Sequence, residues 1–308
     1  MLNALSLTTQ QYKIINKITQ QLGQPDRGKL GGATRVVLWR GQVIRDVGHK
    51  EMIENPEPIE WESLQTGVCR IFNEIGLHAE ENKLITTPRG TVSIDVFAID
   101  PGSIDSIQYI VECKNWKNSI PQSIVHAFTT VMHEVGANIG YIISQKGLQK
   151  GAKDYLKNTN IRGLTFSEFQ QHYLKIWVEK QFCSSIWNVA DALIQYTEPI
   201  NSRRERYRES LAPELNEKFG KLYDKYYLFG MATLAISTGA HNLTRSITGP
   251  PDISVDTLNR IITETLGERY IINTVYLREY LVQLMELIAN ITEEFNGIFG
   301  KNIFVQQG

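Results

Sequence analysis

The chain has 308 residues, of which 42% are hydrophobic and 21% charged, and its formal net charge is −1. This composition is typical of a soluble globular protein, and the length allows two domains or one large one. No apolar run reaches the roughly 18 residues that a membrane span needs. The near-zero net charge excludes a general attraction to nucleic acid, so any such contact must come from a local basic patch.

Three cysteines, Cys69, Cys113 and Cys183, are widely spaced and lie among apolar neighbours. This pattern predicts reduced core thiols and argues against both a disulfide framework and a zinc site. The first residues lack the basic start and apolar stretch of a signal peptide. We therefore expect a cytoplasmic protein.

Residues 1–55 are predicted to form a small N-terminal region. It contains an amphipathic helix over 8–22, a Gly-rich connection over 23–33, and two short strands around Arg40 and Gly41.

Residues 56–174 show a regular alternation of elements. The pattern predicts a helix over 60–77, two strands over 82–100, a strand over 107–116, a helix over 120–136, a strand over 138–145, a helix over 147–159, and a strand from 161 followed by a helix capped by Ser167. This order indicates an α/β domain with a mixed β-sheet flanked by helices.

Residues 175–308 are predicted to form a mostly α-helical C-terminal domain, with helices over 175–196, 203–239, 254–268 and 273–300. Apolar residues recur at helical spacing in the last helix, which indicates packing within the chain or, alternatively, an oligomer interface. We expect this domain to serve recognition, oligomerisation or partner docking.

Two charges interrupt the apolar strand "YIVECKNW". Glu112 and Lys114 are two residues apart, so they project from the same side of the strand. Asp95, in "SIDVFAID", lies between apolar residues of the preceding strand. Neighbouring strands would bring the three side chains into one cluster.

Such a cluster suits a divalent cation, which would offset the cost of burying charge. Carboxylates of Asp95 and Glu112 with the main-chain carbonyl of Cys113 are ligands that Mg²⁺ prefers. Lys114 would then hold a water and stabilise charge on a phosphate. The spacing is equally compatible with a plain ion pair at a sheet edge.

Residues 58–170 resemble the PD-(D/E)xK nuclease superfamily, and within it the Mrr-like restriction endonucleases. The resemblance is carried by "WESLQTGVCRIFNEIGLHAEEN", "SIDVFAID", "YIVECKNWKNSIP" and "GANIGYIISQKGLQKGAKDYLKNTNIRGLTF". It implies that Asp95 and Glu112 bind metal, that Lys114 is catalytic, and that the fold is restriction-endonuclease-like. A glutamate of the first helix often completes such sites; Glu62 matches it, although Glu60 is close by. Ile94 replaces the proline that names the superfamily.

The resemblance implies a Mg²⁺-dependent endodeoxyribonuclease, with Mn²⁺ as a substitute, acting in restriction or anti-phage defence under the control of a partner or signal. A homo-oligomer is expected, because one nuclease core cuts one strand. Two alternatives stay open. One is a non-catalytic nucleic-acid-binding or scaffold subunit of a defence complex, and the other is a structure-specific or RNA-directed nuclease.

Basic residues surround this core. Candidate contacts to nucleic acid are Lys117, Gln122, Lys146, Lys150 and Lys153. A phosphate-tracking surface explains these lysines, and a solvated helix face explains them equally well. The run "NSRRERYRES" (201–210) predicts either a surface for nucleic acid or an acidic partner, or the solvated start of a helix with internal ion pairs.

Overall fold

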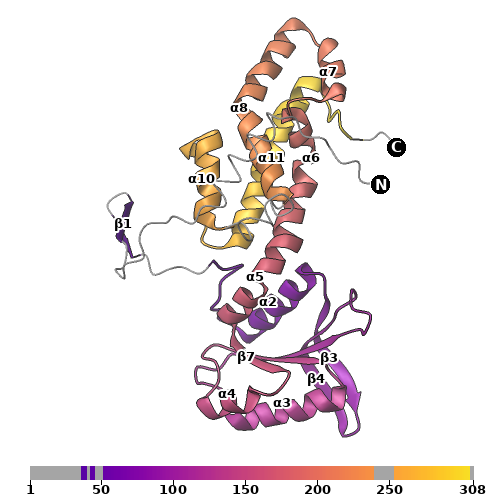
Figure 1. Cartoon of the computed structure of the whole chain (residues 1–308), viewed down its shortest axis with the longest axis vertical. Helices are drawn as coiled ribbons and strands as arrows, with labels where there is room; N and C mark the ends of the chain where they lie inside the picture. Colours follow the sequence, from indigo (N-terminus) through magenta and orange to yellow (C-terminus); the bar gives the residue numbers. More distant parts are fainter. Residues whose placement is uncertain (1–35, 40–41, 46–50, 239–252, 306–308) are drawn as a thin grey trace. The chain divides into compact units, whose positions relative to one another are not determined.

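The computed structural model describes residues 51–238 and 253–305, together with the backbone of 36–39 and 42–45. The helix predicted over 8–22 and most of the loop predicted over 237–254 lie outside the described residues. The chain divides into two compact units, Met52–Gln181 on the one hand and Met1–Glu51 with Phe182–Gly308 on the other (Figure 1). Each unit is described by itself below.

The unit Met52–Gln181 is built on a five-stranded mixed sheet with strand order β3-β4-β5-β6-β7. The strands are β3 (His78–Thr87), β4 (Gly90–Ile99), β5 (Gln108–Lys114), β6 (Ile139–Ser144) and β7 (Ile161–Thr165). Neighbouring strands from β3 to β5 are antiparallel, and those from β5 to β7 are parallel. The predicted mixed sheet is therefore confirmed.

Helices cover both faces of this sheet (Figure 1). They are α2 (Trp61–Glu74), α3 (Gln122–Val135), α4 (Lys150–Leu156) and α5 (Phe166–Trp177). An apolar cluster that includes Phe128 and Ile142 joins α3 and α4 to one face. On the other face, the rings of Phe72 and Phe169 pack at 5.3 Å and bring α2 and α5 together. A Cβ atom at Gly140 of β6 would lie 2.7 Å from the Phe128 ring, so this glycine allows α3 to approach closely.

The parallel pair β5 and β6 ends at one edge of the sheet, where Lys114 lies opposite Ser144. The contact continues beyond the strands: the Ile120 N–H donates to the carbonyl of Gly147, and the Gln149 N–H donates to the carbonyl of Ile120. The loops that follow β5 and β6 are thus held side by side. Both α3 and α4 begin directly after these loops.

The helix α5 begins differently from the prediction. Thr165, not Ser167, caps it: the Thr165 hydroxyl accepts from the Glu168 N–H, and the Glu168 carboxylate accepts from the Thr165 N–H at 2.7 Å. A cap at Ser167 would use Gln170 as its reciprocal partner. Gln170 is fully buried and accepts instead from the Glu54 N–H, so only the Thr165–Glu168 pair is available.

The other unit is mostly helical, as predicted. Its helices are α6 (Ser184–Thr197), α7 (Ser202–Glu209), α8 (Pro213–Ser237), α10 (Val255–Leu266) and α11 (Leu277–Phe299), with a 3₁₀ turn over Glu268–Tyr270. A π-helical segment, Val178–Cys183, connects α5 to α6 along the chain. The ring of Tyr196 stacks on that of Phe295 at 4.9 Å and joins α6 to α11. The helix predicted over 203–239 is interrupted before Pro213, which occupies the first position of α8.

The same unit contains an antiparallel pair, β1 (Val36–Trp39) and β2 (Gln42–Arg45), which confirms the two strands predicted around Arg40 and Gly41. No helix in the described part of the chain is both long enough and apolar enough to cross a membrane.

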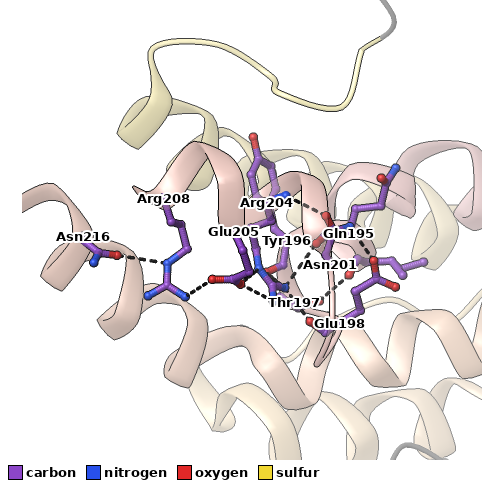
Figure 2. Close-up of polar contacts among 10 residues, drawn as sticks. Gln195, Tyr196, Thr197, Glu198, Asn201, Arg204, Glu205, Arg208 and Asn216 are labelled. Atoms are coloured by element: carbon purple, nitrogen blue, oxygen red, sulfur yellow. Dashed lines mark hydrogen bonds and ion pairs between the residues drawn. The ribbon is translucent and has the colours of Figure 1, made fainter. Parts of the chain in front are cut away.

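The basic run 201–210 is not simply a solvated helix start (Figure 2). Arg204 is 2% exposed, and its guanidinium donates to the carbonyl oxygens of Gln195, Tyr196 and Glu198, the last at 2.5 Å. These carbonyls lie at the C-terminal end of α6, where carbonyl groups have no hydrogen-bond donor within the helix itself. Arg204 also pairs with Glu205 at 2.8 Å. Burial and internal bonding therefore remove Arg204 from any binding surface, because its donors already serve α6.

Candidate active site

Asp95 lies at a gap in the regular pairing of β4. In the β3–β4 ladder, Val96 pairs with Glu81 and Ile94 with Lys83, and the register passes over Asp95. Asn82, on the facing strand, has a positive φ of 53°. The β4–β5 ladder likewise begins only at Val96. At this point a side chain replaces the backbone pairing between the two strands. The Asp95 carboxylate accepts a hydrogen bond from the Cys113 N–H at 2.7 Å, which links β4 to the end of β5.

Glu112 and Lys114 flank that hydrogen bond at the end of β5. Their side chains are 26% and 25% exposed, and they form an ion pair with each other. Both charges act on the neighbouring carboxyl of Asp95. The structure thus brings Asp95, Glu112 and Lys114 together at one edge of the sheet, in the arrangement that the sequence predicts.

The environment of Asp95 disfavours its charged form. Burial raises the pKa of this carboxyl above its ordinary value, and the charge of Glu112 raises it further. The Cys113 N–H and the Lys114 ammonium act in the opposite direction but do not reverse the shift. An ionised Asp95 therefore costs folding free energy at neutral pH, a cost that a bound cation would offset.

The donor set fits a hard divalent cation. Mg²⁺ is usually held by one or two carboxylates, with water and substrate phosphate completing the shell. Asp95 and Glu112 are two such carboxylates. The Cys113 carbonyl accepts from the indole N–H of Trp61 at 3.0 Å, and its second lone pair remains for a ligand.

Glu62 lies in the first turn of α2 and is exposed, as is Glu60, the residue before the helix. Within the described ranges, no group of three or more His, Cys, Asp or Glu side chains is placed to hold a metal ion. Glu62 as a further ligand stays a prediction.

Two residues of α2 contribute to the site without being singled out in the sequence. Trp61 donates to the Cys113 carbonyl, and Gln65, one turn later, is 1% exposed and lowers the pKa of Asp95. Gln65 shares the helix face of Leu64 and Val68, which are both buried. A polar residue on an otherwise apolar face is the signal that could have identified it.

The predicted nucleic-acid contacts come from the same edge of the sheet as Lys114. They are Lys117 in the loop after β5, Gln122 at the start of α3, Lys146 in the loop after β6, and Lys150 and Lys153 in α4. All five are exposed. The loops that carry Lys117 and Lys146, and that lead into α3 and α4, are bonded to each other.

Comparison with known proteins identifies this unit. Residues 57–172 match a family model, Mrr_cat, that is described as a restriction endonuclease. The curated proteins contain no match to the chain. A solved structure, titled as that of a protein of unknown function, AF1548, is 13% identical and covers 78% of this chain and 99% of its own, with a TM-score of 0.32. That score is too low to extend the assignment beyond the matched domain.

The matched range spans the mixed sheet, its flanking helices and the cluster of Asp95, Glu112 and Lys114. Residues 57–172 of this chain are therefore a restriction endonuclease domain with an Mrr-like PD-(D/E)xK nuclease core.

Proposed function

We propose that the protein is a Mg²⁺-dependent endodeoxyribonuclease, with Mn²⁺ as a substitute ion. The observation that carries this proposal is the Asp95 carboxylate, bonded to the Cys113 N–H and adjacent to Glu112 and Lys114, within a domain of the restriction endonuclease family. This combination places a carboxylate of β4 beside a carboxylate and an ammonium group at the end of β5, where a phosphodiester can approach.

Each residue has a distinct role in this proposal. Asp95 and Glu112 hold the cation, together with the Cys113 carbonyl. When bound, the ion would polarise the phosphate and lower the pKa of a bound water. Lys114 orients the attacking water and stabilises charge that develops on the phosphate oxygens. Glu112 keeps the Lys114 ammonium at the site through their ion pair.

The exposed basic residues at the same edge fit a path for the nucleic-acid backbone. Lys117, Lys146 and Lys150 project from the two bonded loops and the start of α4. Contacts of this kind fix the register of a phosphate chain without reading its sequence. Gln122 and Lys153 would extend the path along α3 and α4.

The direct test is cleavage of plasmid DNA in Mg²⁺, compared with Glu112→Ala, Lys114→Ala and EDTA. Loss of an electrostatic contributor of this kind lowers the rate by about 10²–10³-fold. Lys175→Ala, an exposed lysine near the end of α5, is the matched control and should cut like the parent. Equal cleavage by Glu112→Ala and the parent would refute the assignment.

The Glu112–Lys114 ion pair also supports a second candidate, a non-catalytic binding or scaffold subunit in which the pair is purely structural. Under that alternative the protein binds DNA equally with and without Mg²⁺ and does not cut. Parallel assays on plasmid, branched DNA and RNA separate the proposed activity from a structure-specific or RNA-directed nuclease.

We further propose a restriction or anti-phage effector that is gated by a partner or signal and acts as a homo-oligomer, with the helical residues 175–308 supplying the docking surface. The net charge of −1 supports gating, because the whole chain has no general attraction to DNA. Cleavage assays with and without a co-purified partner test this, and equal rates would argue against gating.

A further inference from the structure

Gln65 is a buried polar residue that the proposed mechanism does not use. It lies on α2, is 1% exposed, and its Nε2 donates to no acceptor at full hydrogen-bond distance. Buried amide donors are almost always paired, because an unpaired one loses its bonds to water without replacement. An orphaned donor in this position therefore requires an explanation.

The surroundings of Gln65 point to the carboxylate cluster. Trp61, one turn earlier on α2, donates to the carbonyl of Cys113, whose N–H binds Asp95. Residues four apart lie on the same side of a helix, so Gln65 follows Trp61 along the side that approaches β4 and β5. The helix α2 packs against both β4 and β5, so the buried amide of Gln65 lies on the face of α2 that covers the strands of Asp95 and Cys113.

Asp95 has room for a second donor. The Cys113 N–H binds its Oδ2 at 2.7 Å, so one oxygen of the carboxylate is fixed by the backbone. A metal ligand must be held from more than one direction, because the partners behind a ligand set its orientation and hence its affinity for the ion. The unpaired side-chain N–H of Gln65 is the group on α2 that can donate a second hydrogen bond to the Asp95 carboxylate.

We propose that Gln65 is a positioning residue: when a divalent cation binds, its side-chain amide donates to the Asp95 carboxylate and holds it in the orientation that the ion requires. This inference rests on the proposed function, since it assigns Asp95 to the metal. Gln65 acts through Asp95 and does not touch the nucleic acid. Gln65 contributes to the binding of the ion. Its loss should therefore raise the half-saturating ion concentration more than it lowers the cleavage rate at saturating ion.

The test is Gln65→Met in the full chain, a change that keeps the length of the side chain and removes the donor. Melting is followed against added Mn²⁺ and Mg²⁺, and cleavage is measured over the same concentrations. We expect the half-saturating ion concentration to rise at least about tenfold, a typical cost of removing a group that supports a ligand. Saturating ion should restore most of the cleavage rate.

A merely structural role predicts the opposite pattern. If Gln65 only supports the fold, Gln65→Met melts lower without metal and titrates like the parent, and that result would overturn the proposal. If it positions Asp95, the metal-free melting temperature stays equal or rises, because an unpaired buried amide has been removed. Gln65→Asn, which withdraws the amide by one methylene, should shift the metal titration in the same direction.

Gln170→Met is the matched control. Gln170 is also fully buried with an unpartnered Nε2, but its Oε1 accepts from the Glu54 N–H. This variant should change stability while its metal titration coincides with that of the parent. A parent that neither cuts nor responds to metal would refute the proposed function itself. A parent that responds, with Gln65→Met responding at the same concentrations, would refute only the role of Gln65.

Discussion

The carboxyl of Asp95, a candidate metal ligand, lowers the stability of the folded protein when it is ionised. Burial and the neighbouring Glu112 both raise the pKa of this group. The raised pKa means that the folded state holds the proton more tightly than the unfolded chain does. The resulting destabilisation is absent below the ordinary pKa of an aspartate and develops as the pH rises through the pKa of the folded state.

Asp95→Asn should therefore separate stability from activity. Without metal at pH 7, the variant is expected to melt at the same temperature as the parent or a few degrees higher, because asparagine keeps an acceptor for the Cys113 N–H without the buried charge. At about pH 4, near the ordinary pKa of aspartate, this advantage should shrink. Thermal denaturation in EDTA measures both effects.

Cleavage by Asp95→Asn should be lost in the same preparations. Asp105→Asn removes an exposed carboxyl and serves as the control, with unchanged melting and cleavage. A lower melting temperature for Asp95→Asn at pH 7 would contradict the interpretation of Asp95 as a costly buried charge.

At the scale of elements, a side chain of α7 caps the C-terminal carbonyl groups of another helix, α6. The guanidinium of Arg204 satisfies carbonyls of Gln195, Tyr196 and Glu198 at the end of α6 (Figure 2). Asn201 caps α7 by accepting from the Arg204 N–H at 2.8 Å. The turn between the two helices is thus fixed by one residue that serves both.

Arg204→Met should destabilise the protein by about 3 kcal/mol, since it leaves buried polar groups unpaired in the way that breaking a buried charge pair does. Arg206→Met, two residues away and exposed, should change the unfolding free energy by less than about 0.5 kcal/mol. Urea denaturation compares the two variants. Equal, small effects would mean that Arg204 does not support the end of α6.

At the scale of the whole molecule, attraction to DNA has to be local, because the net charge is only −1. The loops after β5 and β6 gather Lys117, Lys146 and Lys150 at the edge that carries Lys114. Each phosphate contact contributes to the salt dependence of binding through released counterions.

Lys146→Glu with Lys150→Glu should weaken DNA binding for every sequence tested and reduce the slope of log affinity against log salt by about 2, roughly one unit for each lost contact. Charge reversal at Lys218 and Lys221, exposed residues of α8, is the control and should leave the slope unchanged. Salt titrations of binding in Ca²⁺ or EDTA keep the measurement separate from cleavage. An unchanged slope for the double variant would mean that these lysines form a solvent-exposed surface and do not contact the phosphates.

The sequence by itself determined the order and type of the elements of residues 56–174 and the shared side of Glu112 and Lys114. These features depend on periodicity between near neighbours, which a strand or helix imposes locally. Resemblance to known nucleases added the roles of Asp95, Glu112 and Lys114, which stay predictions until cleavage is measured.

Only the tertiary structure decided which polar groups face one another. The bond from the Cys113 N–H to Asp95, the burial of Arg204 and the cap at Thr165 each depend on a partner that folding places nearby, whereas the buried amide of Gln65 is left without one. Some of these partners are close in sequence and others distant. For Arg204 and Gln170 the choice among competing polar partners is made by burial, because a group removed from water must find a partner inside the fold.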